Sequence, residues 1–476
     1  MTAHELPALA DELSEWVGKP LTEAGLDRLT EVILRHYDDH DRPVNEVAVP
    51  PQDVGAGTLK LEVLEGRIGQ VGVDRMHYFN NERVQKGIRM QEGALLYGSD
   101  LQADLDWLSR NPFRRATLFA APGEGISADL LLKIDERRPW RIYAGYDNSG
   151  SESVGANRWF AGFNWGDAFG LDQVVGYQVT VGDALRDFQA HTVSWELPLH
   201  ARHQFLRVSG GWAETRTDEA LGPTISGAEG SSWQVGAMFG APLRKTAGWK
   251  QEVQGGLEFK RSDNFFVFGD TSLPGTEVDI VQFRGDWKGE RTFDNTTLEL
   301  FASLVASPGE LTAQNGNDEF EAFRPGANPA YVYGRLGATW QDPHTETWSW
   351  KLRGNIQLAT GALLPTEQLA LGGNATVRGY PERILLADSG YALSAELSTP
   401  TLSKDLGPLG RSTIRGIAFL DHGLGWREGD GSKSLTGAGL GTRIKLGTFG
   451  EGRLDLGRGL DGGDGVNLYT GWFFSF

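Results

Sequence analysis

This 476-residue chain contains no cysteine, and it has no long apolar run. Without cysteine there is no disulfide framework, no thiol nucleophile and no cysteine-based metal site. Mean hydropathy is -0.34, and no apolar stretch reaches about 18 residues, so a helical membrane protein is not expected. A β-barrel remains open, because its strands alternate apolar and polar residues and their hydropathy averages to a modest value.

An excess of basic residues is also missing. The formal net charge is -18, which argues against a nucleic-acid partner, since such partners require basic patches. The sequence contains no H-E-x-x-H motif, no G-x-S-x-G motif and no phosphate loop, so neither an enzyme, a cofactor nor a metal site is expected. Residues Met1–Glu5 lack the basic and apolar regions of a signal peptide, so we expect a mature or truncated form with an added Met.

The C-terminal two-thirds of the chain alternates with period two. In Tyr391–Ser398 and in Val466–Phe476, one face of the segment is apolar. A soluble sandwich and a membrane barrel both fit this pattern. Three features favour the barrel. Charged residues recur on the polar face, aromatic residues such as Trp140 and Trp159 lie near strand ends, where an interfacial girdle would place them, and the chain ends on an aromatic strand. Thirteen of the 15 Trp follow residue 138, which marks a boundary between two kinds of structure.

From Trp140 onward the sequence contains about sixteen strand-like segments, an even number that can close a barrel without open edges. We expect these strands to begin near Arg141, Asn157, Leu171, Phe188, His203, Ser232, Trp249, Glu277, Thr297, Tyr331, Trp348, Gly390, Ser412, Leu435, Gly450 and Val466. The longest late loop is expected between Thr360 and Ser389.

The N-terminal third is expected to form two small α/β modules. In the first, Thr22 is the candidate N-cap of a helix with Leu26, Leu29, Ile33 and Tyr37 on one face. The remaining expected elements are strands at Val47–Pro50, Thr58–Leu64 and near Val71, helices at Glu82–Met90 and Ser99–Arg110, and strands at Ala116–Ala120 and Ser127–Ile134.

Two short motifs carry the most information. Val377-Arg378-Gly379-Tyr380 lies in the long loop, and Phe419-Leu420-Asp421-His422-Gly423 closes an alternating strand. A buried Arg or Asp requires a partner, because an unpaired buried charge is costly. The two motifs are therefore candidates to meet, although the tetrapeptide alone would be interpreted as an ordinary surface loop.

The chain also contains the segments Gly18–Thr22, Val49–Asp53, Gly57 with Val63–Ile68, Leu108–Pro112, Asp135–Trp140 and Gly439–Arg443. Together with Val377–Tyr380 and Phe419–Gly423, these segments resemble the transporter component of two-partner secretion. This family belongs to the Omp85 superfamily and includes the secretors of haemolysin and filamentous haemagglutinin. The resemblance implies an α+β pair of POTRA domains, residues 1–67 and 68–138, followed by an all-β transmembrane barrel of about 16 antiparallel strands, residues 139–476. It also implies that a loop near 360–389 folds into the barrel. The sequence departs from the family pattern at its start, where the opening strand of the first POTRA domain is expected to be missing or remodelled and the plug helix common in the family is not found, so the presence of a plug stays open.

The resemblance also implies roles for individual residues. The loop tip would be locked to the lumen wall, the G-x-G-x-R segment would lie on a neighbouring strand, and the aromatic end would act as the signal for barrel insertion. The expected lock is Val377, Arg378, Gly379, Tyr380, Phe419, Asp421 and Gly423; the lumen lining is Glu396, Gly439, Gly441, Arg443, Arg453 and Asp455; the insertion signal is Trp472, Phe474 and Phe476.

The function that the resemblance implies is ATP-independent export of one large partner exoprotein, an adhesin, haemolysin or contact-dependent toxin. The pore would lie in the bacterial outer membrane with its POTRA domains in the periplasm. It would recognise the N-terminal secretion domain of the exoprotein, contact outer-membrane lipid, and depend on the barrel assembly machinery for biogenesis. Two alternatives remain open, an Omp85-type insertase and a passive porin or receptor.

Overall fold

The computed structural model describes residues 5–55, 57–151, 154–217, 227–246, 248–268, 271–462 and 465–476. It contains two compact units. The first comprises Met1–Arg138 with the short segments Gly170–Asp172 and His200–His203, and the second comprises Pro139–Phe169, Gln173–Leu199 and Gln204–Phe476. Within the described ranges, no helix is both long enough and apolar enough to cross a membrane.

The first part of unit one is a helix pair beside a two-stranded sheet. Thr22 caps helix α2 by accepting a hydrogen bond from the Gly25 N–H at 3.0 Å, as predicted. A further helix, α1, precedes it and was not expected. Leu9 of α1 packs with Ile33 and Tyr37 of α2, which explains why so short a helix is stable. These elements are α1 (Glu5–Ser14), α2 (Glu23–Asp39), β1 (Asn45–Ala48) and β2 (Glu62–Glu65), and the two strands pair antiparallel.

The second part of unit one is a three-stranded sheet with two helices. Its strand order is β3-β5-β4, with β3 parallel and β4 antiparallel to the central strand, and its core includes Leu108 and Leu132. Helix α3 is shorter than predicted. It ends near Gly87, where a Cβ would lie 2.8 Å from the Trp107 ring. The elements are β3 (Arg67–Val73), α3 (Asn81–Gln85), α4 (Gly98–Leu108), β4 (Arg114–Pro122) and β5 (Ser127–Glu136).

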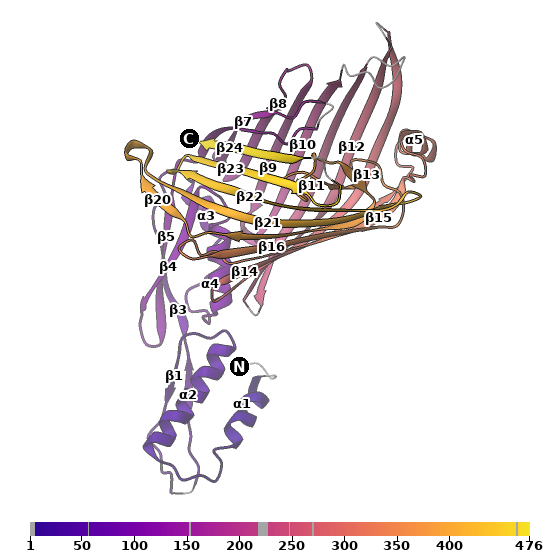
Figure 1. Ribbon diagram of the computed structural model, residues 1–476. Coiled ribbons are helices and arrows are strands. Elements are labelled where there is room, and N and C mark those ends of the chain that lie inside the picture. Colours follow the sequence, from indigo (N-terminus) through magenta and orange to yellow (C-terminus); the bar gives the residue numbers. More distant parts are fainter. Residues whose placement is uncertain are drawn as a thin grey trace. The chain divides into compact units, whose positions relative to one another are not determined.

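Unit two is a closed antiparallel barrel, which confirms the predicted fold (Figure 1). Its wall strands are β6 (Trp140–Asp147), β7 (Arg158–Ala168), β8 (Gln173–Val181), β9 (Phe188–Leu199), β10 (Gln204–Thr217), β11 (Gly227–Thr246), β12 (Trp249–Phe268), β13 (Thr271–Phe293), β14 (Thr296–Pro308), β15 (Ala330–Gln341), β16 (Ser349–Ala359), β19 (Ser389–Ser398), β20 (Leu402–Asp405), β21 (Arg411–Arg427), β22 (Gly431–Leu446), β23 (Gly450–Gly459) and β24 (Val466–Ser475).

The wall contains 16 strands in the described residues, because β19 and β20 form one strand. Both pair with β21, and the register shifts by one residue between the pairs Ser398↔Ile417 and Leu402↔Ile414. Pro400 lies in this interruption, where its missing N–H costs no ladder bond. Pairing of β24 with β6 closes the barrel.

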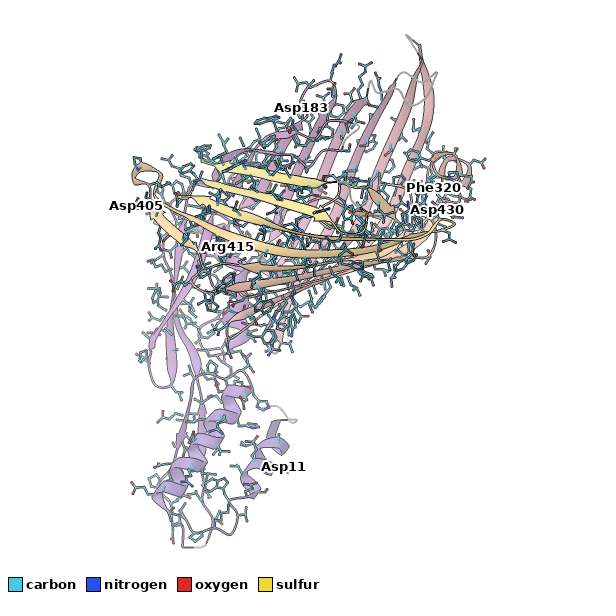
Figure 2. The ribbon with its side chains drawn as sticks, viewed as in Figure 1. Asp11, Asp183, Phe320, Asp405, Arg415 and Asp430 are labelled. Carbon is cyan, nitrogen blue, oxygen red and sulfur yellow. The ribbon has the colours of Figure 1, made fainter. Side chains whose placement is uncertain are left out.

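The two faces of the wall differ as a lipid-facing barrel requires. Outward side chains such as Leu336, Leu420 and Leu440 are more than half exposed, whereas Asp421 and Asp455, on the opposite face of their strands, are fully buried. On these strands charge therefore faces inward and apolar surface faces outward. Asp405 and Asp430, by contrast, lie near the opposite ends of the wall around β21 (Figure 2).

Two long connections lie at the same end of the barrel. The β14–β15 connection contains helix α5 (Asn317–Phe323), and the β16–β19 connection contains the small strands β17 (Leu369–Leu371) and β18 (Leu385–Ala387). The connections meet in one core, in which Phe320 packs with Leu363 and Leu364. The described residues also form the 3-10 turns η2 (His200–Arg202) and η3 (Gly407–Leu409).

Candidate functional site: an inward loop and its seat in the barrel wall

The loop that connects β16 to β19 folds into the barrel. Its tip, Val377–Tyr380, contacts inward-facing residues of β21, β22 and β24, and each described side chain of the tip is buried. The Arg378 residue is only 2 % exposed. A charged side chain at such a position must be neutralised by the wall around it.

Asp421 of β21 is the principal partner of Arg378. Its Oδ2 accepts hydrogen bonds from the Arg378 backbone N–H at 3.1 Å and from Nε at 2.7 Å, and its Oδ1 accepts one from Nη2 at 2.9 Å. Both residues are buried, so this bidentate, charge-assisted pair replaces water around both groups. The structure thus brings together the two motifs that the sequence singled out.

The rest of the guanidinium contacts two other strands. Nη1 donates to Glu396 Oε1 of β19 at 2.6 Å and lies 3.5 Å from Asp455 Oδ2 of β23, while Nη2 donates to Ser394 Oγ at 3.2 Å. The Arg378 Cζ also lies 3.6 Å from the centroid of the Phe419 ring, a cation–π arrangement. One side chain therefore connects the loop to three strands of the wall.

Arg443 extends this ionic network along the wall. It donates to the two Asp455 oxygens at 2.5 and 3.1 Å and lies 3.6 Å from Glu396 Oε1. Gly441 is directly opposite Asp455 in the register, and a Cβ at Gly441 would clash with the Asp455 carboxylate. The glycine thus leaves room for the network.

Glycines also allow the tip and its aromatic neighbour to approach the wall. Gly439 is opposite Phe419, and a Cβ there would lie 2.5 Å from the Phe419 ring. A Cβ at Gly423 would lie 2.9 Å from Val377. Gly379 has a φ of 103°, and its Cβ would lie 2.5 Å from the Arg458 carbonyl carbon, so only glycine fits this backbone without strain.

Three polar residues of the site were not singled out from the sequence. The Tyr469 hydroxyl of β24 accepts from the Gly379 N–H at 2.8 Å and donates to the Tyr380 carbonyl at 2.6 Å, and Asn467 donates to the Gly379 carbonyl at 2.8 Å. Ser394 is the third. Each is an isolated polar residue on an alternating strand, so no local pattern distinguishes it from other lumen residues.

The base of the loop has a second buried ion pair that the sequence did not indicate. Arg324 Nη2 donates to Asp388 Oδ2 at 2.8 Å, and the Asp388 carboxylate also accepts from the backbone N–H groups of Leu363 and Glu428 and from the Gln368 amide. Burial alone would raise the pKa of Asp388, but the hydrogen bonds from Arg324 and these other donors lower it to about 2.

A third anchor is Glu367, which accepts hydrogen bonds from Lys260 at 2.8 Å, Tyr333 at 2.8 Å and Gln282 at 3.2 Å. These three donors belong to β12, β15 and β13. The loop is therefore held at its base by one arc of the barrel and at its tip by another.

The remaining expected residues lie on or next to the last two strands of the barrel. Trp472 and Phe474 of the last strand lie beside the glycines Gly452 and Gly450 of β23. The Phe476 backbone exchanges hydrogen bonds with Ile142 at 2.9 and 3.2 Å, and its side chain is exposed. Arg453 lies opposite Arg443. Within the described part of the chain, no three His, Asp or Glu residues are arranged to hold a metal ion.

The described tip is held to the wall by hydrogen bonds and ion pairs rather than by covalent bonds. The site is therefore an internal loop that packs against one side of a closed barrel.

Comparison with known proteins agrees with this geometry. The family described as haemolysin secretion/activation protein ShlB/FhaC/HecB matches residues 127–444, and the ShlB-type POTRA domain matches residues 2–66. The heme/hemopexin transporter protein HuxB of Haemophilus influenzae is 22% identical over 434 residues, which cover 88% of this chain and 72% of that protein.

The hemolysin transporter protein ShlB of Serratia marcescens is 26% identical over 430 residues, 84% of this chain and 72% of that protein. The solved structure of CdiB from Escherichia coli superimposes with a TM-score of 0.84 at 20% identity, covering 100% of this chain and 88% of that one. The chain belongs to the haemolysin secretion/activation protein family ShlB/FhaC/HecB.

Proposed function

We propose that this protein is an outer-membrane pore that recognises one large partner exoprotein and exports it by two-partner secretion without ATP. The observation that carries the proposal is the buried Arg378, which holds an internal loop to three strands of a closed barrel by exchangeable polar contacts. A barrel with such a loop can admit a chain when those contacts rearrange. Membership of a secretion family supports this interpretation.

In this proposal residues 1–67 and 68–138 are POTRA domains in the periplasm, and 139–476 form the barrel with its inward loop near 360–389. The POTRA domains bind the N-terminal secretion domain of the exoprotein. Their sheets have free edges in the described residues, at β1 and β2 and at β3 and β4, to which an extended chain could add as a strand. Folding of the exoprotein outside the cell would give the transport its direction.

The other assignments follow from the same proposal. Val377, Arg378, Gly379 and Tyr380 with Phe419, Asp421 and Gly423 form the loop lock. Glu396, Gly439, Gly441, Arg443, Arg453 and Asp455 line the lumen. Trp472, Phe474 and Phe476 form the signal that the barrel assembly machinery reads, and the apolar outer face contacts outer-membrane lipid. The protein performs no catalysis and requires no cofactor.

Secretion itself tests the proposal. The chain, supplied with a signal peptide, is expressed in a Gram-negative host together with the large exoprotein encoded beside its gene, and the exoprotein is quantified in the medium and the periplasm. We expect exoprotein in the medium only when this chain is present. Exoprotein retained in the periplasm despite a folded, inserted barrel would contradict the proposal.

The same strains separate the two alternatives. An insertase predicts that depletion of the chain lowers the amounts of many outer-membrane proteins. A passive porin predicts altered uptake of small solutes with no change in the exoprotein. We expect neither effect.

A further inference from the structure

Three arginines lie side by side on the inner wall of the barrel. Arg415 of β21 is directly opposite Arg443 of β22, which is directly opposite Arg453 of β23. Like charges directly opposite each other on neighbouring strands destabilise a sheet. We call Arg415, Arg443 and Arg453 the arginine rung. The whole chain has a net charge of -18, so a local row of three positive charges calls for a functional explanation.

The members of the arginine rung differ in how they are neutralised. Arg443 is paired with Asp455. The Asn374 side-chain oxygen, in the amide orientation that satisfies its neighbours, accepts from the Arg453 Nη atoms at 2.8 and 2.5 Å. Arg415 forms no ion pair and no side-chain hydrogen bond with any described residue, although it is half-buried. Its guanidinium therefore has its hydrogen-bonding capacity free.

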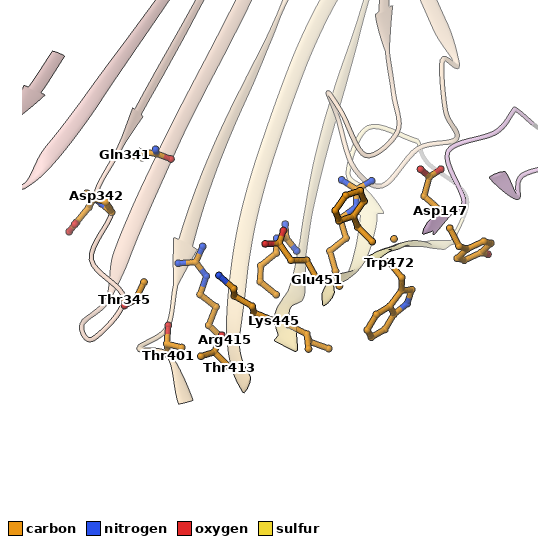
Figure 3. Close-up of a pocket in the computed structure, with 18 of the residues that line it drawn as sticks. Asp147, Gln341, Asp342, Thr345, Thr401, Thr413, Arg415, Lys445, Glu451 and Trp472 are labelled. Carbon is orange, nitrogen blue, oxygen red and sulfur yellow. The ribbon is translucent and has the colours of Figure 1, made fainter. Parts of the chain in front are cut away.

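The arginine rung lines a cavity of about 750 Å³ in the second unit. Arg415, Lys445 and Glu451 are among the side chains that surround it in Figure 3. Lys445 is exposed, and although it is opposite Glu451 in the register, no ion pair joins them in the described structure. The lining contains two further acidic residues: Asp147 accepts a hydrogen bond from the Ser149 N–H at 2.9 Å, and Asp342 is bound to His344. The volume is in the range of sites that enclose a small ligand or a few side chains.

The cavity lies near the end of the barrel where β16 and β21 begin and β24 ends, and it extends to Tyr146 and Asp147, the last two residues of β6. It includes Asp342 and Thr345 of the β15–β16 turn and Thr401 beside β20. In the proposed topology this is the periplasmic end, because the POTRA domains immediately precede β6 in the chain. A polypeptide that enters from the periplasm would meet this cavity before it reaches the loop tip.

We propose that the arginine rung binds carboxylate side chains of an acidic segment of the exported polypeptide as it enters the barrel. Guanidinium groups match carboxylates through paired hydrogen bonds, and those bonds are stronger where water is limited. Asp455 fixes Arg443 in place, while the guanidinium of Arg415 is free to form two parallel hydrogen bonds with a carboxylate. The inference rests on the proposed export function and specifies the chemistry of the segment that is recognised first.

Binding of a simple acidic peptide tests the site without a partner protein. The purified full chain in detergent is titrated into a fluorescently labelled oligoglutamate peptide, and anisotropy is recorded, with oligoglutamine as the uncharged probe. We expect oligoglutamate to bind and oligoglutamine not to bind. Arg415→Gln should weaken oligoglutamate binding about tenfold, roughly 1.4 kcal/mol. Raised salt should weaken it further.

Arg427→Gln is the matched control. It removes the same charge from the other end of β21, where Arg427 faces Asp430 of the turn at 3.5 Å, and binding should be unchanged. Equal weakening by both variants, equal binding of the two peptides, or full binding by Arg415→Gln would overturn the proposal.

A second variant guards against misfolding. Arg415→Lys keeps the positive charge but loses the paired N–H groups of the guanidinium, so it should bind oligoglutamate less tightly than the unaltered chain. The mobility of each variant on an unheated gel reports whether its barrel is closed. Unchanged binding by a closed Arg415→Lys barrel would contradict the paired hydrogen bonds.

The outcome is separable from the export function, because a chain that secretes its exoprotein but binds no oligoglutamate overturns the arginine rung alone. A chain that binds the peptide but secretes nothing overturns the export function.

Discussion

Asp421 accepts three hydrogen bonds from Arg378 alone, one from the backbone N–H and two from the guanidinium, at 3.1, 2.7 and 2.9 Å. The same residue thus fixes both the position of the loop backbone and the charge of the loop tip. Displacing the loop would take all three of these donors away from the Asp421 carboxylate. This coupling makes the tip a sensitive place to test the function.

Replacing the arginine should impair export without unfolding the barrel. In Arg378→Ala the loop loses its partners on β19, β21 and β23. Leaving a buried carboxylate unpaired costs about 3–5 kcal/mol. We expect the variant to insert, to protect residues 360–389 poorly against proteinase K, which does not depend on arginine, and to secrete less exoprotein.

Arg383→Ala is the control for that variant, because Arg383 is an exposed residue of the same loop. The double variant Arg378→Ala with Asp421→Ala should recover part of the loop protection, since no buried carboxylate then remains unpaired. Normal secretion by Arg378→Ala would rule out the loop lock.

A methyl group at the tip should displace the loop. In Gly379→Ala the new Cβ would lie 2.5 Å from the Arg458 carbonyl carbon, at a φ of 103°. Both the contact and the backbone conformation disfavour alanine. We expect faster hydrogen exchange in residues 374–382 and reduced secretion.

Gly429→Ala is the control that separates the backbone strain of alanine at a positive φ from the steric clash of its Cβ with Arg458. Gly429 has a φ of 85°, and a Cβ at this position would have no atom within 4 Å, so it carries a similar backbone cost without the clash. Comparable loosening of the loop by both variants would show that the approach to Arg458 is unimportant.

The hydroxyl of Tyr469 should contribute to the closed loop. Tyr469→Phe leaves the Gly379 N–H and the Tyr380 carbonyl without this partner. An unsatisfied buried group costs about 1–3 kcal/mol. Hydrogen exchange at Gly379 should therefore accelerate, while the barrel melts at nearly the same temperature.

Tyr391→Phe is its counterpart, because the Tyr391 hydroxyl contacts His422 rather than the loop tip. Exchange at Gly379 should be unaffected there. If Tyr469→Phe leaves the exchange of Gly379 unchanged, β24 does not help to hold the tip.

The anchor at Asp388 should resist mild acid. Its pKa is lowered from 3.8 to about 2, because the hydrogen bonds from Arg324 and other donors outweigh the effect of burial. Because the pKa of Asp388 is lowered in the folded protein, the stabilisation of the loop by this carboxylate is complete above pH 3.8 and is lost as the pH falls toward 2. Pepsin cleavage within 360–389 should therefore stay slow above pH 3.8 and become faster below that pH.

Asp388→Asn should remove the pH dependence of this cleavage and expose the loop to pepsin even above pH 3.8. Asp430→Asn, in an exposed turn, should leave the cleavage profile unchanged. If cleavage of the unaltered chain stays flat down to a pH of about 2, Asp388 does not anchor the loop.

Much of the barrel could be predicted because the alternation of a strand is local. Strands predicted to begin at Phe188, Trp249, Gly450 and Val466 begin there. Strand β11 begins at Gly227 rather than near Ser232, because a Gly- and Ser-rich extension lacks the alternation that marks a strand. Helix α1 was missed for a similar reason, since its stability comes from packing on α2 rather than from its own sequence.

The sequence by itself determined the fold class, the family and the two motifs that meet, because period-two patterning and short motifs are written within single segments. Only the tertiary structure decided that Glu396, Ser394, Tyr469 and Asn467 share the loop tip, and that three arginines fall side by side. Those neighbours lie on different strands of a closed barrel, and their proximity depends on register and closure, which no local pattern encodes.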